Sequence, residues 1–121
     1  MRRYRLSVAA QHDLIAILAW THEHFGAAAR KRYEKLIVTA LRDVATQPDR
    51  PGNVVRAELG DGVRSWHLRL SRGRARPIAG IVRRPRHFLI YRIEGDIVAV
   101  ARVLHDAMEP ARHLDPDESW E

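Results

Sequence analysis

Residues 87–104 read HFLIYRIEGDIVAVARVL, and this stretch decides the fold. Residues 87–93 are apolar on both faces of an extended chain, which is typical of a strand in the middle of a sheet. Glu94-Gly95-Asp96 has the composition of a hairpin turn, and the apolar run at residues 97–104 follows as the next strand. The stretch therefore predicts a pair of core strands joined by a tight turn.

The chain before this hairpin changes from loop to strand and back to loop. Residues 48–62 contain prolines and glycines without periodicity, so we expect a loop there. Residues 63–70 alternate with a period of two, which predicts a strand. Its two faces carry Trp66, Leu68 and Leu70 on one side and Ser65, His67 and Arg69 on the other. Residues 71–85 form a basic loop, within which residues 78–82 are a candidate short strand.

Two helices are predicted in the first third of the chain. Ser7 is a good N-cap for the first helix, although Ala10 occupies the position where a capping box needs Glu or Gln. Gly26 ends this helix, and the second covers residues 27–46 before Pro48 stops it. The second helix has an amphipathic stripe formed by Tyr33, Leu36, Ile37, Ala40, Leu41 and Val44. The short break predicts an antiparallel helical hairpin.

With a strand at residues 4–6 and a closing helix near residues 106–113, the predicted order is β-α-α-β-β-β-α. This is an α+β domain in which the helical hairpin packs on a small antiparallel sheet. The 121 residues suit a single domain spanning residues 1–121. Residues 1–47 form the strand and hairpin, residues 63–105 the sheet, and residues 106–121 an acidic tail.

Composition excludes several classes of protein. With 45% hydrophobic and 30% charged residues the chain is globular, and the absence of cysteine excludes disulfide scaffolds and cysteine-ligated zinc. No apolar run reaches the length of a membrane span, and no signal peptide follows Met1, so we expect a cytoplasmic protein. His22 and His24 lack the i, i+4 spacing of a helical zinc site. We expect no metal and no cofactor.

Positive charge is concentrated in the sheet region. The net charge is +6, yet residues 63–92 contain nine basic residues and no acidic one. The nine are Arg64, Arg69, Arg72, Arg74, Arg76, Arg83, Arg84, Arg86 and Arg92. Such a cluster repels itself unless phosphates, an acidic protein surface or the acidic tail lie nearby. A solvated surface is the alternative, and we expect a negatively charged macromolecule as partner.

Several segments resemble the ParE toxins of the ParE/RelE superfamily of type II toxin–antitoxin systems. The segments are Tyr4 to Leu14, Trp20 to Gly26, Arg32-Tyr33, Arg86 to Arg92, Val100 to Asp106, and Met108 to Leu114. The likeness covers almost the whole chain, whereas residues 71–85 are longer and more basic than the usual tight hairpin. It implies a bacterial toxin held inactive by an antitoxin, ParD-like or similar, and operator DNA contacted only through that complex. ParE-like members poison DNA gyrase, whereas RelE-like members cut mRNA on the ribosome.

If the chain were a RelE-like, metal-independent endoribonuclease, it would need an acid–base group and cations around the phosphate. Among the histidines at 87 and 105, His105 is the preferred acid–base group, with Arg86, Arg92 and Arg102 around the phosphate. The alternative for His105 is a structural role, as a hydrogen-bonded residue that closes a strand end. The alternative for Arg102 is also structural, as a buried partner for a tail carboxylate such as Asp106 or Glu109. No lysine follows Lys35 and no tyrosine follows Tyr91, which weakens this hypothesis.

The first hypothesis is therefore a non-enzymatic toxin that binds gyrase, and a non-toxic basic binding module is a third alternative. The predicted target-binding residues are Arg69, Arg83, Arg84, Arg86, Arg92 and Arg102. The predicted antitoxin-binding residues are Leu18, Trp20, Phe25 and Trp66, because an antitoxin helix needs apolar anchors. Packing inside the domain is the alternative for Trp20 and Trp66.

Overall fold

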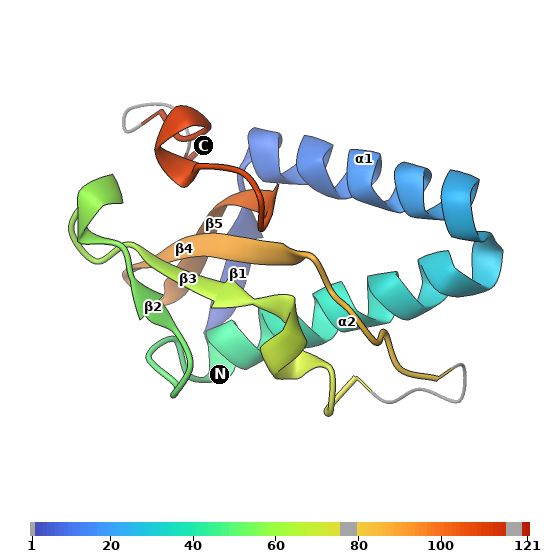
Figure 1. Cartoon of the computed structure of the whole chain (residues 1–121). Helices are drawn as coiled ribbons and strands as arrows, with labels where there is room; N and C mark the ends of the chain where they lie inside the picture. The colour runs from blue at the N-terminus through green and yellow to red at the C-terminus, as the bar shows by residue number, and fades with distance from the viewer. Residues whose placement is uncertain (1, 76–79, 116–119) are drawn as a thin grey trace.

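The computed structural model describes residues 2–75, 80–115 and 120–121 (Figure 1). Within them, two α-helices, α1 (Val8–Phe25) and α2 (Ala27–Thr46), form a hairpin beside a five-stranded sheet. The strands are β1 (Arg3–Leu6), β2 (Val54–Val55), β3 (Arg64–His67), β4 (His87–Glu94) and β5 (Ile97–His105), in the order β1-β5-β4-β3-β2. Short 3₁₀ turns are η1 (Ala57–Leu59), η2 (Leu68–Ser71) and η3 (Pro110–Arg112). The predicted α+β class is confirmed.

The β4–β5 hairpin forms the centre of the sheet, as its sequence predicts. The two strands pair antiparallel from His87↔His105 to Glu94↔Ile97, with a register shift at Ile90/Tyr91. β4 lies between β3 and β5, and its residues from Phe88 to Tyr91 are buried. This explains why β4 is apolar on both faces.

One edge of the sheet differs from the prediction, because β1 pairs in parallel with β5. The partners run from Arg3↔Ile97 to Leu6↔Val100. No short turn fixes the direction of β1 relative to β5, since most of the chain lies between them. The helical hairpin supplies the long connection that a parallel pair requires. The sheet is therefore mixed rather than wholly antiparallel.

Three local predictions were wrong in extent. The strand predicted over residues 63–70 ends at His67, where the His67 ring Nδ1 accepts a hydrogen bond from the Arg69 amide and a 3₁₀ turn begins. The loop predicted over residues 48–62 contains β2 and η1. The closing helix is only the η3 turn. Of the candidate strand at 78–82, residues 80–82 are not in a strand, and residues 78–79 lie outside the described part.

Ser7 connects the start of α1 to the sheet. Its Oγ accepts from the Ala10 amide at 2.9 Å and donates to the Ala101 carbonyl of β5 at 2.6 Å. The predicted N-cap is thereby confirmed, and the same hydroxyl anchors the helix to β5. α2 follows Gly26, whose φ of 91° lies in the left-handed region that favours glycine. The bounds of α2 are those predicted.

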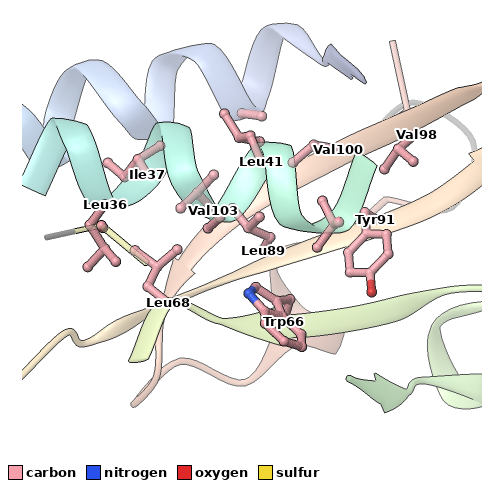
Figure 2. Packing of buried hydrophobic residues seen from close by; sticks show 14 of the residues in the cluster. Leu36, Ile37, Leu41, Trp66, Leu68, Leu89, Tyr91, Val98, Val100 and Val103 are labelled. Carbon is pink, nitrogen blue, oxygen red and sulfur yellow. The ribbon is translucent and has the colours of Figure 1, made fainter. Parts of the chain in front are cut away.

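The main core lies between the helices and one face of the sheet. Figure 2 shows Leu36, Ile37 and Leu41 of α2 packed toward residues of the strands and of η2. The strand and turn residues labelled there are Trp66, Leu68, Leu89, Tyr91, Val98, Val100 and Val103. A second buried cluster includes Phe88, Ile90 and Leu104 with Leu114 and Trp120 from the C-terminal segment. Both faces of β4 and β5 are therefore covered. Neither described helix combines the length and apolarity that crossing a membrane requires.

Candidate functional site

An open groove of about 1920 Å³ lies beside the helical hairpin. α1 contributes Ile17, Trp20 and Phe25 to its lining, and α2 contributes Arg32 and Tyr33. The remaining lining comes from η2 and the two residues after it, from the loop at residues 80–86, from the ends of β4 and β5, and from Met108. This loop extends below α2 in Figure 1, toward the turn of the helical hairpin. The groove thus brings together the exposed end of the hairpin and the arginine-rich loop.

The α1 side of the groove carries exposed aromatic side chains. Trp20 is 54% exposed and Phe25 67% exposed. The Trp20 ring stacks on His24 with centroids 4.1 Å apart and meets Phe25 edge-on at 5.6 Å. The His24 Nδ1 donates to the Trp20 carbonyl at 2.9 Å, which holds the stack in place. These aromatic residues form an ordered apolar surface that no described residue covers.

The other two residues predicted to bind an antitoxin lie differently. Leu18 is partly buried and packs against the main core. Trp66 is 2% exposed, and its Nε1 donates to Ser71 Oγ at 2.9 Å within the core. Trp66 was wrongly predicted as a surface anchor, because β3 directs its indole toward α2. Of the two alternatives for Trp66, core packing is the one observed.

Besides the partly buried Arg32 of α2, four exposed arginines that line the groove have no carboxylate partner among the described residues. They are Arg69 and Arg72 from η2 and the residue after it, and Arg83 and Arg84 from the loop. Arg72 Nη1 donates to the Arg83 carbonyl at 2.8 Å, so the loop is tied to the chain after η2. All four side chains are exposed. Their positive charge is therefore uncompensated at this surface.

Three other arginines of the cluster are ion-paired within the chain, contrary to the expectation that the cluster is unneutralised. Ion pairs join Arg74 to Asp43, Arg86 to Asp106 and Arg92 to Glu94, while Arg64 hydrogen-bonds to Asn53. Arg76 lies outside the described residues. Counting the charges within residues 63–92 did not reveal Asp43, because its partner Arg74 is 31 residues away in the sequence.

Arg92 and Arg102 do not line the groove. Arg92 lies over the Trp120 ring at 4.1 Å, beside Glu94. Arg102 forms a bidentate pair with Asp13 of α1, at 2.8 Å and 2.9 Å. Its partner is therefore neither Asp106 nor Glu109, the two carboxylates expected from the sequence. The geometry does not bring Arg92 or Arg102 together with His105.

The buried Tyr33 and the partly buried His87 form a pair in the groove. Tyr33 Oη accepts from the Arg86 amide at 3.2 Å and lies 2.6 Å from His87 Nδ1. Burial raises the pKa of Tyr33 to about 12. Burial, followed by the neighbouring His105, lowers the pKa of His87 to about 4. Near neutral pH the tyrosine hydroxyl therefore donates to an uncharged imidazole.

Asp106 organises the adjacent side chains. Its carboxylate lies 3.1 Å from His67 Nε2, 3.3 Å from Arg86 Nε and 3.6 Å from His105 Nδ1. Burial opposes ionisation, yet the His67 hydrogen bond and the nearby charges hold the pKa of Asp106 below its ordinary value. Burial lowers the pKa of His67 despite that hydrogen bond. His105 Nδ1 accepts from the Ala107 amide at 3.0 Å, so its proton is carried on Nε2.

This arrangement places His105 and Arg86 together in the groove, beside His87 and the other groove-lining arginines. An imidazole can move a proton and a guanidinium can stabilise a phosphate, so the pair has two elements of phosphodiester chemistry. Sequence reasoning missed Tyr33, His67 and Asp106 as neighbours of this pair. Tyr33 was identified only as part of the core stripe, and only the register of β3 beside β4 brings His67 close. Among the described residues, no group of three or more histidine or acidic residues can hold a metal ion.

His87 should make the folded state pH-dependent. A folded pKa of about 4 lies below the ordinary 6.5, so the unfolded chain binds a proton first as the pH falls. The stabilisation of the folded state by uncharged His87 is complete above about pH 6.5 and is lost as the pH falls toward 4. Because the ring is partly exposed, we expect a loss of about 1 kcal/mol between about pH 7 and pH 5.

Urea denaturation of the wild type and of His87→Asn at the two pH values measures this. Asn keeps an acceptor for the Tyr33 hydroxyl and does not titrate, so the variant should lose less stability on acidification. His67, whose pKa is also lowered, and the carboxylates remain in both proteins and serve as the common background. Equal losses in wild type and variant would show that His87 does not contribute.

Comparison with known proteins identifies a family for the chain. The family model described as "ParE toxin of type II toxin-antitoxin system, parDE" matches residues 4–110. No curated protein matches the chain. The matched span includes both helices, the whole described sheet except Arg3, and every groove-lining residue.

Proposed function

We propose a function from the premise that this chain belongs to the ParE toxin family of type II toxin–antitoxin systems. As a toxin of such a system it has an antitoxin partner. The proposal is that it inhibits DNA gyrase by binding to it or to its complex with DNA, without bond chemistry of its own. A cognate, ParD-like antitoxin in the cytoplasm would neutralise it, and operator DNA would be contacted only through that complex.

The observation that carries this proposal is the set of uncompensated arginines, Arg69, Arg72, Arg83 and Arg84, in one groove. Guanidinium groups form bidentate contacts with carboxylates and phosphates, and a dense positive patch accelerates encounters with a negative partner. Arg86 adds to the patch although Asp106 partly neutralises it. Arg92 and Arg102, which pair with Glu94 and Asp13, play no part in the proposed contact.

The antitoxin would bind the same groove through its aromatic side. Trp20 and Phe25 offer exposed apolar area, with Leu18 behind them against the core. An amphipathic helix binds such a surface by placing apolar side chains at i, i+3 and i+4. Acidic residues on that helix would pair with the free arginines. Occupying both sides of the groove would explain how one segment masks the toxin.

The proposal is tested by adding the purified chain to purified gyrase and relaxed plasmid, and separately to a reconstituted translation reaction. We expect supercoiling to be inhibited and the mRNA to stay intact. Trimmed mRNA together with normal supercoiling would contradict the proposal and favour cleavage.

One observation favours RNA cleavage as the second candidate, namely that His105 and Arg86 lie in the same groove beside His87. Cleavage through His105 would make His105→Ala lose activity by about a hundredfold or more. If the chain acts by binding gyrase, this variant should inhibit growth as strongly as the wild type. Colony counts after expression measure this, and His12→Ala, on the exposed face of α1, is the matched control. A selective loss of toxicity in His105→Ala would favour cleavage.

A further inference from the structure

We infer that the groove binds single-stranded nucleic acid, with a base stacked against Trp20 and the backbone phosphates on Arg69, Arg72, Arg83 and Arg84. The inference goes beyond gyrase inhibition and does not depend on it. An antitoxin bound over Trp20 would also exclude this ligand.

The aromatic side has the geometry of a stacking surface. The Trp20 indole is about half exposed although it belongs to an ordered helix. Its near-parallel stack on His24, inclined by 22°, and the edge contact with Phe25 fix the ring, and about half of the side chain stays exposed. Stacking on a fixed ring loses little side-chain entropy, and every base has a face that can stack. The surface is therefore prepared for a base of any sequence.

The arginine side of the groove can bind the phosphates of a nucleic-acid backbone. Four exposed guanidinium groups without carboxylate partners in the described residues line the same groove as Trp20, together with the partly buried Arg32. Planar guanidinium groups match phosphate oxygens in bidentate geometry. The hydrogen bond from Arg72 to the Arg83 carbonyl ties the two arginine-bearing segments together. Aromatic and cationic groups side by side in one groove are the combination that binds single strands.

A single strand suits this arrangement better than a duplex. The aromatic residues lie in the groove with the arginines, so the ligand must present base faces and phosphates together. Duplex DNA keeps its bases stacked inside the helix and offers the groove only its backbone. An acidic protein segment without apolar side chains would satisfy the arginines and leave Trp20 without a partner.

The inference is tested with a fluorescein-labelled oligonucleotide of about 12 nucleotides, within the usual range of single-strand sites. Binding to its single-stranded DNA and RNA forms and to the matched duplex is followed by anisotropy at low and high salt. Trp66 and Trp120 are buried, so quenching of tryptophan emission by unlabelled oligonucleotide reports on Trp20. We expect quenching, tighter binding of single strands than of duplex, and weaker binding at high salt.

Two pairs of variants sharpen the test. Trp20→Ala should weaken single-strand binding by about tenfold, whereas Ile15→Ala, exposed on the same helix outside the groove, should not. Arg83→Glu with Arg84→Glu should weaken binding and flatten its salt dependence. Arg30→Glu with Arg42→Glu, an equal charge change on exposed α2 positions outside the groove, should affect binding less.

No binding at low salt would overturn the inference, as would equal affinity for duplex or unchanged binding by Trp20→Ala. Displacement of the oligonucleotide by polyglutamate at equal charge concentration would also overturn it, and would point to an acidic protein instead. If single strands bind normally but supercoiling is unaffected, the nucleic-acid site stands and gyrase inhibition fails. If supercoiling is inhibited without oligonucleotide binding, only the present inference fails.

Discussion

Replacing Asp43 with alanine should remove about 3 to 5 kcal/mol from the free energy of unfolding, because it leaves buried positive charge without a partner. Asp43 is 8% exposed on α2. It accepts from Arg74 Nη2 at 2.8 Å and lies 3.2 Å from Arg50 Nη1. It also accepts from Ser71 Oγ at 2.6 Å. One carboxylate thus holds the loop after α2 and the η2 turn against the helix.

The effect should extend into the main core. Ser71 Oγ, which donates to Asp43, accepts from the buried Trp66 indole at 2.9 Å. The Arg50 side chain is mostly buried, and its Nε has no hydrogen-bond partner, so Asp43 supplies the negative charge that this guanidinium requires. Arg74 is about half exposed and can regain water after the substitution. Arg50 therefore accounts for most of the expected loss.

Urea denaturation followed by far-UV circular dichroism measures the change. Asp43→Asn keeps an acceptor for Ser71 and should be destabilised less than Asp43→Ala. Glu34→Ala changes an exposed carboxylate on the same helix and should shift stability by less than about 0.5 kcal/mol. A loss below about 1 kcal/mol in Asp43→Ala would show that the network contributes little.

Reversing Arg83 and Arg84 to glutamate should abolish growth inhibition, and this is the largest functional effect that we expect. Both side chains are exposed in the groove, and neither has a carboxylate partner among the described residues, so reversal should not cost folding stability. It replaces two attractive charges by two repulsive ones toward an acidic target. We expect the association rate at low salt to fall by at least about tenfold and its salt dependence to flatten.

Colony counts after induced expression measure the loss of toxicity, and thermal unfolding confirms that the variant is folded. Arg30→Glu with Arg42→Glu changes the net charge equally on exposed α2 positions outside the groove. This control should remain toxic. Equal toxicity of the two double variants would mean that the loop arginines are only solvated surface.

The elements that the sequence predicted well are those with local signals. The bounds of α2 follow from its apolar stripe and Pro48, and the β4–β5 hairpin follows from two apolar runs around a turn. The direction of β1 has no such signal, because its partner in the sheet is more than 90 residues away. β3 ends at His67, whose ring accepts a hydrogen bond from the Arg69 amide, and the alternation of apolar and polar residues does not reveal this.

The site was predicted in part for the same reason. Counting charges along the chain identified the arginine-rich region, yet Asp43 reaches it from α2. Glu94 and Asp106 pair with two of its arginines from just outside it. Only the three-dimensional fold separates the free arginines from the paired ones. Trp20 and Phe25 were expected to be exposed because an antitoxin helix needs apolar anchors. Trp66 is also a large aromatic residue and was predicted to be an anchor, but the pleat of β3 turns its side chain into the core.

The most direct test of the central claim, that the free arginines of the groove carry the toxic contact, is a titration of purified gyrase. Supercoiling of relaxed plasmid is followed with increasing wild-type chain, with Arg83→Glu/Arg84→Glu, and with Arg30→Glu/Arg42→Glu. We predict inhibition by the wild type and by the second variant, and at least about tenfold weaker inhibition by the first. Normal supercoiling at saturating wild-type chain, or equal inhibition by all three proteins, would contradict the claim.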